Sequence, residues 1–179
     1  MKKFDFDLAV IGSGAAGGTA AMVAAGAGLR VALIEAGSWG GASVNRCDIP
    51  SLAAAHFSQT FFGAIEAGKF GLSSTNLRYN YPSVLNWNLM ARKRAGADDK
   101  KVFEEAGVKC ISGFAQFVGP NELAITDHKN ITATKFIVAT GAAAVDPGIT
   151  GAKEAGCLMP EDVFELKRIP KVVMVVGGG

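Results

Sequence analysis

Three glycines near the N-terminus have the spacing of a dinucleotide-binding turn. They form the pattern Gly12-x-Gly14-x-x-Gly17, which follows an apolar run and opens an Ala-rich stretch. In such a turn the first glycine allows a tight bend, the second lets backbone approach a pyrophosphate, and the third allows close helix-to-strand packing. Glu35 lies roughly 20 residues further on, where a carboxylate accepts hydrogen bonds from ribose hydroxyls and repels a 2′-phosphate. Together these residues predict a dinucleotide site.

A strand, a helix and a second strand must position these residues. Residues 6–11 and 29–35 are apolar enough for buried strands, and residues 12–27 supply the turn and the helix between them. This order has the length of a βαβ unit, so we expect a parallel pairing with a right-handed crossover. Residues 50–66 and 84–106 predict two further helices.

The C-terminal half has a different pattern of short alternating runs. Residues 108–118, 122–126 and 131–139 predict a three-stranded β-meander. The expected fold is therefore α/β and Rossmann-like, with a mostly parallel sheet, flanking helices and this meander. Residues 142–171 are rich in Gly and Pro and suit a linker, while residues 172–179 repeat the N-terminal order of a strand followed by Gly-x-Gly.

The loop after Glu35 resembles part of a flavoprotein family. In disulfide reductases similar to dihydrolipoamide dehydrogenase and mercuric reductase, this region carries Gly-Gly, a C-x-x-x-x-C dithiol and I-P-S-K, and residues 40–52 follow that pattern in part. The resemblance continues through residues 54–56, Gly113-x-Ala115, residues 139–141 and residues 166–170. The chain is thus similar to the FAD-binding N-terminal domain of the pyridine nucleotide-disulfide oxidoreductases.

This resemblance implies that the dinucleotide is FAD, bound in extended form along the C-terminal edge of the first strand. It implies that backbone near Gly113-x-Ala115 meets the adenine, and that the complete protein uses NADH or NADPH. Fingerprint and resemblance together give the expected FAD-binding residues: Ile11, Gly12, Gly14, Ala15, Ala16, Gly17, Glu35, Ala36, Gly40, Gly41, Ala42, Ser43, Cys47, Gly113, Ala115, Ala139, Thr140 and Gly141.

The departures from the family pattern concern its redox centre. Ser43 and Asp48 stand where the family has its two cysteines, and Leu52 stands where it has a lysine beside the flavin. A hydroxyl and a carboxylate cannot form a disulfide, so thiol exchange by the family's route is not available. We expect a flavin-dependent NAD(P)H oxidoreductase that is not a disulfide reductase, with Asp48 as the candidate proton donor or binding carboxylate.

Two alternatives remain open from the sequence. Cys47 occupies the family's glycine position, and a single reactive thiol there could cycle through sulfenic acid in a peroxidase-like flavoenzyme. Against this, Cys47 could be a structural cysteine that fills space near the flavin. The other alternative is a non-catalytic flavin-binding module or scaffold that lost its dithiol. Under every interpretation, we expect that this chain alone does not catalyse a reaction.

The composition of the chain excludes some classes of binding partner and bears on its domain organisation. The 18 basic and 16 acidic residues give a net charge of +2, without the basic excess typical of nucleic-acid-binding proteins. The three cysteines lack C-x-x-C spacing, and no apolar run is long enough to span a membrane. We therefore expect a cytoplasmic protein with no metal, which forms a homodimer when complete. Residues 1–150 would be the FAD-binding domain, 151–171 a linker, and 172–179 the start of a truncated NAD(P)-binding domain.

Overall fold

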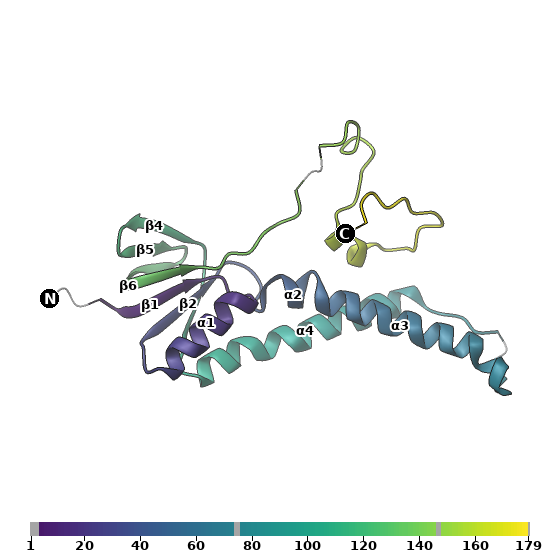
Figure 1. The fold of residues 1–179 in the computed structure, drawn as a ribbon, viewed down its shortest axis with the longest axis horizontal. Coiled ribbons are helices and arrows are strands. Elements are labelled where there is room, and N and C mark those ends of the chain that lie inside the picture. The colour runs from purple at the N-terminus through teal and green to yellow at the C-terminus, as the bar shows by residue number, and fades with distance from the viewer. Residues whose placement is uncertain (1–3, 74–75, 146–147, 179) are drawn as a thin grey trace.

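The computed structural model describes residues 4–73, 76–145 and 148–178, except for the side chains of residues 97–99. Its six strands form one sheet in the order β3-β2-β1-β6-β5-β4, and a long pair of helices extends away from it (Figure 1). The elements are β1 (Phe6–Ile11), α1 (Ala15–Gly26), β2 (Val31–Glu35), α2 (Gly41–Asn45), α3 (Asp48–Glu66), the 3-10 helix η1 (Ala67–Phe70), α4 (Tyr81–Glu105), β3 (Lys109–Ser112), β4 (Ala115–Gly119), β5 (Glu122–Ile125), β6 (His128–Val138) and the 3-10 helix η2 (Pro160–Glu165).

The sheet combines a parallel half with an antiparallel half. β1 pairs in parallel with both β2 and β6, and β2 pairs in parallel with β3. β4, β5 and β6 form the antiparallel meander, so β6 belongs to both halves. The predicted α/β class and mostly parallel sheet are confirmed.

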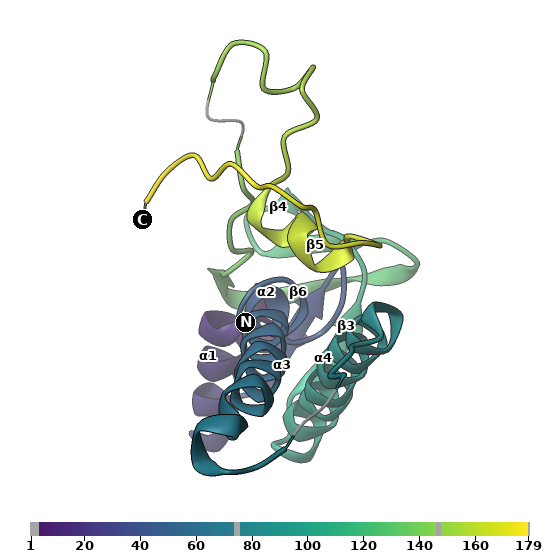
Figure 2. The same cartoon turned by 90° about the vertical axis from the view of Figure 1, so that its right-hand side faces the viewer.

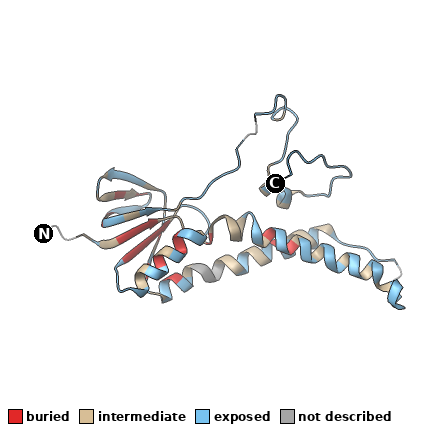
Figure 3. Cartoon of the chain, in the orientation of Figure 1, coloured by how far each residue is buried: buried red, intermediate tan, exposed pale blue. Residues whose placement is uncertain are grey.

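Side chains that alternate along the central strands form two cores. On one face, Ala9 and Ile34 pack with Leu123 and Ile131 of the meander. On the other face, Val10 and Leu33 pack with helix residues, among them Phe103 of α4. Figure 3 shows that the buried positions concentrate in these strands and in the helices beside them. The central strands that carry the site are therefore packed on both faces.

Helices α3 and α4 form an antiparallel hairpin that reaches beyond the sheet (Figure 1), and an end-on view shows the two helices side by side (Figure 2). The base of this hairpin is anchored: a Cβ added to Gly18 of α1 would lie 2.7 Å from Cζ of Phe103, so α1 and α4 are in close contact. Within the described residues, neither these two helices nor any other is both long and apolar enough to cross a membrane.

Two features of the elements differ from expectation. Residues 108–118 form two strands, because the chain turns at Gly113, which has a φ of +149°. A side chain is also excluded there, since a Cβ on Gly113 would lie 2.6 Å from the carbonyl oxygen of Thr126. β3 consequently joins the parallel half and only β4 joins the meander. The loop after β2 contains the short helix α2, which the pattern of glycines concealed. α3 begins at Asp48 and ends at Glu66, so Pro50 lies in its first turn as predicted.

The segment after β6 crosses back over the start of the helical hairpin. Arg46 pairs with Glu161 at 3.6 Å, and Arg92 pairs with Glu165 at 3.0 Å, so both pairs attach η2 to the body. Residues 172–176 form no strand in the described part of the chain, since no neighbouring strand offers them hydrogen bonds. Gly179, the end of the expected second Gly-rich turn, lies outside the described residues. The second domain stays a prediction.

Two carboxylates fix the start of β1. The N and Oγ of Thr132 donate to Asp5 Oδ2 at 2.9 and 2.8 Å, and Nη2 of Arg30 donates to Asp7 Oδ1 at 2.7 Å. The hydrogen bonds from Thr132 lower the pKa of Asp5, and those from Arg30 lower the pKa of Asp7, because they stabilise the ionised form.

We expect the free energy of unfolding to fall when the pH drops through the folded-state pKa values of Asp5 and Asp7. A carboxyl group with a lowered folded pKa contributes stability above its unfolded pKa and loses that contribution as the pH falls through the folded one. Urea unfolding at pH values below about 4 measures the effect. Asp7→Asn should make the pH dependence shallower, and an unchanged slope would contradict this role.

Candidate functional site

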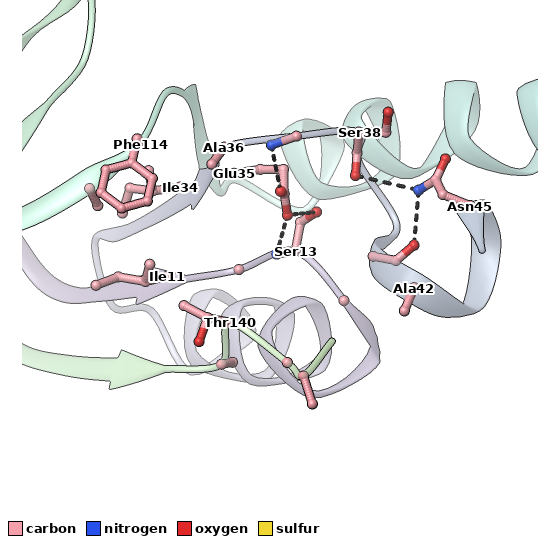
Figure 4. Close-up of a pocket in the computed structure, with 18 of the residues that line it drawn as sticks. Ile11, Ser13, Ile34, Glu35, Ala36, Ser38, Ala42, Asn45, Phe114 and Thr140 are labelled. Carbon is pink, nitrogen blue, oxygen red and sulfur yellow. Dashed lines mark hydrogen bonds between the residues drawn. The ribbon is translucent and has the colours of Figure 1, made fainter. Parts of the chain in front are cut away.

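The carboxyl ends of four parallel strands meet at one edge of the sheet. β1, β2, β3 and β6 end there, and the segments that follow them line a cavity of about 600 Å³. In open α/β sheets, ligands bind in the crevice outside the carboxyl ends of the strands. This cavity is therefore the candidate functional site (Figure 4).

Two of the three glycines of the turn between β1 and α1 have no room for a side chain. A Cβ on Gly12 would lie 2.3 Å from the carbonyl oxygen of Ala139, and a Cβ on Gly17 would lie 1.9 Å from the carbonyl oxygen of Gly12. Gly12 also has a φ of +104°, which side-chain-bearing residues rarely adopt. The strand end, the helix and the residue after β6 thus approach each other through backbone alone.

Helix α1 begins without a side-chain cap. Its N-cap residue is Gly14, no side chain accepts a hydrogen bond from its first turn, and no acidic residue lies in that turn. The first N–H groups of a helix have no partners within it, and the helix dipole adds partial positive charge at this end. The bend at Gly41 packs directly on this end of the helix through backbone atoms, because a Cβ on Gly41 would lie 2.5 Å from Cα of Gly14. The helix end suits an anion such as a pyrophosphate.

Glu35 is held at the end of β2 by three hydrogen bonds. The N and Oγ of Ser13 donate to its Oε2 at 2.8 and 2.7 Å, and the N of Gly37 donates to its Oε1 at 2.8 Å. Figure 4 shows the side chains of Ser13 and Glu35 turned toward each other at the Gly turn. The carboxylate therefore has a fixed orientation at the cavity wall.

Asn45 organises the loop that leads from β2 into α2. Its Nδ2 donates to the carbonyl oxygens of Trp39 and Gly41, both at 2.9 Å. Gly40, with a φ of +91°, is the N-cap residue of α2. These contacts hold the Gly40–Gly41 bend against the Gly turn, and Asn45 itself lines the cavity.

The residues present fit a dinucleotide. The cavity offers an uncapped helix end for phosphates, a fixed carboxylate for a ribose, and a wall of glycine and alanine backbone between them. At the far side from the helix end, the ring of Phe114 is 68% exposed although it lines the cavity, and it presents a face on which a planar base can stack.

The structure brings most of the expected FAD-binding residues to this cavity. Those in its wall are Ile11, Gly12, Gly14, Glu35, Ala36, Gly41, Ala42, Gly113, Ala115, Ala139, Thr140 and Gly141. Ala15, Gly40 and Ser43 line a smaller neighbouring cavity of about 240 Å³, which shares Ser13 and Gly14 with the first. Ala16, Gly17 and Cys47 line neither of these two cavities.

Several residues in the wall were missed by sequence reasoning. They are Ser13, Ile34, Gly37, Ser38, Asn45, Arg46, Phe114 and Ala142. A signal existed for some of them: Ser13 stands inside the Gly-rich turn, and Phe114 stands between the two residues expected beside adenine. A polar or aromatic residue inside a nucleotide-binding turn is a binding candidate in its own right.

Ser43 and Asp48 lie side by side at the junction of α2 and α3. The Oγ of Ser43 donates a short hydrogen bond to Oδ2 of Asp48 at 2.6 Å. Cys47, between them in the chain, is exposed and is the N-cap residue of α3. Cys110 is a poor nucleophile, because burial raises the pKa of its thiol to about 11.

Comparison with known proteins assigns the chain to a family. The family model described as pyridine nucleotide-disulphide oxidoreductase matches residues 6–179. A glutathione reductase from Burkholderia cepacia is 34% identical over the whole chain, and a mercuric reductase from Streptomyces lividans is 32% identical over 97% of it. The chain covers only 39% and 38% of the length of these two relatives.

Solved structures give the same assignment. The Cu(II) complex of RclA, an HOCl-induced flavoprotein disulfide reductase from Escherichia coli, superposes with a TM-score of 0.72 at 25% identity. The match covers 91% of this chain and 34% of that structure. FAD is the cofactor of such family members. The chain, with its Gly turn, fixed carboxylate and carboxyl-edge cavity, belongs to the pyridine nucleotide-disulphide oxidoreductase family.

Proposed function

We propose that this chain is the FAD-binding part of a flavin-dependent NAD(P)H oxidoreductase. The observation that carries the proposal is the cavity at the carboxyl edge, where an uncapped helix end and the fixed Glu35 carboxylate face one space. When bound, FAD supplies reversible acceptance of a hydride or of electrons. The protein's contribution is to hold the cofactor extended and to place its reactive end.

Each part of the cavity has an assigned role in this proposal. The N-terminus of α1 holds the pyrophosphate, Glu35 accepts from the ribose hydroxyls, and the turn at Gly113–Ala115 contacts the adenine. The segment at Thr140–Gly141 lies against the dinucleotide on the β6 side. In the same proposal, residues 1–150 form the FAD-binding domain, 151–171 a linker and 172–179 the start of an NAD(P)-binding domain, and the complete protein is a cytoplasmic homodimer.

The visible absorption spectrum of the purified chain tests the cofactor. After incubation with FAD and gel filtration, a retained flavin band with vibrational structure is the expected result. Absence of flavin after gel filtration, from a chain whose circular dichroism shows the folded state, would overturn the assignment of this cavity. The same experiment with FMN, which lacks the adenosine half, is the control for the ribose and adenine contacts.

Phe114→Ala is expected to weaken FAD binding by about 1–3 kcal/mol, the usual contribution of an aromatic side chain stacked on a base. The ring is mostly exposed and packs on little else, so its removal should leave the free energy of unfolding nearly unchanged. Titration of flavin fluorescence measures the affinity, and Phe114→Trp should restore it. An affinity equal to that of the native chain would remove Phe114 from the adenine site.

The electron acceptor in this proposal is not a disulfide. The supporting observation is the Ser43–Asp48 hydrogen bond at 2.6 Å, since these two residues stand where the family pattern has its cysteines. With no dithiol to relay electrons, the flavin would pass them directly to an acceptor, with Asp48 as its proton donor or binding carboxylate. In the complete protein, NADH-dependent reduction of lipoamide or glutathione disulfide should be undetectable, and measurable turnover would refute this point.

Two further candidate functions make different predictions for the complete protein. A non-catalytic flavin module would bind FAD but would not reduce any small-molecule acceptor, such as a quinone or ferricyanide, with NADH. The Cys47 route requires peroxide-dependent NADH oxidation that Cys47→Ser abolishes. Cys47 and Asp48 are both exposed and neither lines the main cavity, but Asp48 accepts a hydrogen bond from Ser43, which lines the neighbouring cavity, and this contact supports Asp48 as the residue that acts beside the flavin.

A further inference from the structure

We infer that Ser13 is a positioning residue for recognition of the FAD ribose, and that it acts through Glu35. This inference rests on the proposed function, because it assigns a role to one residue of the same cavity. Ser13 lies between the first two glycines of the turn, and its side chain faces Glu35 across the end of β2 (Figure 4).

The hydroxyl of Ser13 is buried and fully engaged. Only 1% of the residue is exposed, so its polar atoms depend on partners within the protein. Its Oγ donates to Glu35 Oε2 at 2.7 Å and accepts from the N of Gly40 at 3.2 Å. A buried serine that links two loops in this way contributes defined geometry, because each partner would be left unsatisfied without it.

The contacts of Ser13 determine which part of Glu35 is left for a ligand. A carboxylate has about four lone-pair positions, and three of them are occupied by the N and Oγ of Ser13 and by the N of Gly37. Two of these three donors belong to Ser13 and converge on Oε2, so they fix the rotation of the carboxylate. The remaining acceptor position is then presented to a ribose hydroxyl in a preset direction.

Ser13 also joins the ribose side of the site to the loop that precedes α2. Gly40 is the N-cap residue of α2, and α2 carries Ser43, whose hydroxyl contacts Asp48. The same hydroxyl therefore sets both the ribose carboxylate and the bend that leads to the Ser43–Asp48 pair.

The test compares FAD with an analogue that lacks both hydroxyls of the adenosine ribose. The native chain should bind FAD roughly 10- to 100-fold more tightly than the analogue, the usual effect of a hydrogen bond to a charged group. Ser13→Ala removes the hydroxyl donor and keeps the backbone N–H of residue 13, so this ratio should fall at least about threefold. In Glu35→Gln and in the double variant it should fall to within about threefold of unity. Ser58→Ala removes a hydroxyl with a 3.0 Å hydrogen bond on the remote helix α3 and should keep the native ratio.

The ratio distinguishes positioning from a purely structural role. If Ser13→Ala weakened FAD and the analogue equally, so that the native ratio survived, the inference would be overturned. If Ser13→Ala did not fold, Ser13→Cys would be judged by the same ratio, since a thiol of similar size forms only weak hydrogen bonds. Failure of the native chain to bind FAD would instead refute the proposed function and this inference with it.

Discussion

Replacement of Gly17 by alanine should abolish FAD retention and lower the free energy of unfolding by more than about 3 kcal/mol, as steric overlap in a packed core does. The added Cβ would lie 1.9 Å from the carbonyl oxygen of Gly12 and 3.2 Å from Cβ of Ala139. Neither neighbour can retreat easily, because the N of Gly12 is bonded to Ile34 O at 2.8 Å and the N of Ala139 to Ile11 O at 2.8 Å.

Gly26→Ala is the matched control on the same helix. A Cβ at Gly26, the last residue of α1, meets nothing within 4 Å, so alanine should stabilise the chain by up to about 1 kcal/mol through its higher helix propensity. Urea unfolding with and without FAD measures both variants. If Gly17→Ala behaved like Gly26→Ala, the close packing of α1 on the turn would be refuted.

Restoring two cysteines at Ser43 and Asp48 should give a chain that forms a reversible disulfide. The Oγ of Ser43 stands where a cysteine sulfur would be and lies 2.6 Å from Asp48 Oδ2, which is one bond beyond the position of a sulfur at residue 48. A disulfide needs sulfur atoms about 2.05 Å apart, so its formation tests whether the two Cβ atoms are close enough. The triple variant Ser43→Cys, Cys47→Gly, Asp48→Cys also removes the neighbouring native thiol, which would otherwise compete for exchange.

Thiol titration and intact mass report the outcome of this restoration. The oxidised triple variant should show two fewer reactive thiols than its form reduced with dithiothreitol, and a mass lower by two hydrogen atoms. Variants with Cys47→Gly and only one of the two new cysteines are the controls and should show no such change. Two thiols that stay free under oxidising conditions would mean that positions 43 and 48 do not form the equivalent of the family's redox pair.

The N-terminal part of the site could be predicted from the sequence, because the residues that determine it lie close together in the chain. The spacing of Gly12, Gly14 and Gly17 after an apolar strand requires a tight turn, and the carboxylate at Glu35 follows at the end of the next strand. The structure has β1, α1 and β2 where these patterns predict them. The glycine contacts also have the steric origin that the pattern implies.

The parts of the fold and of the site that could not be predicted depend on contacts between residues that lie far apart in the sequence. β3 and β4 form one alternating run, and only pairing with β2 on one side and β5 on the other separates them at Gly113. The position of Ser13 in the Gly-rich turn marks it as a candidate, but its role follows only when Glu35 and Gly40 are placed around it. Phe114 is likewise marked by its neighbours in the sequence, but its exposure at the cavity is known only from the structure.

The position of β1 between β2 and β6 has a consequence for the order of folding. β2 follows β1 after a single helix, but Phe6 pairs with Ala133 on the other side, so the second edge of β1 is completed only when β6 has been synthesised. Until then the nascent chain presents an unpaired apolar strand edge, which is prone to association with other chains. The wall around Ala139 and Gly141 is missing over the same period. FAD can therefore bind and stabilise this domain only after nearly all of the sheet has formed.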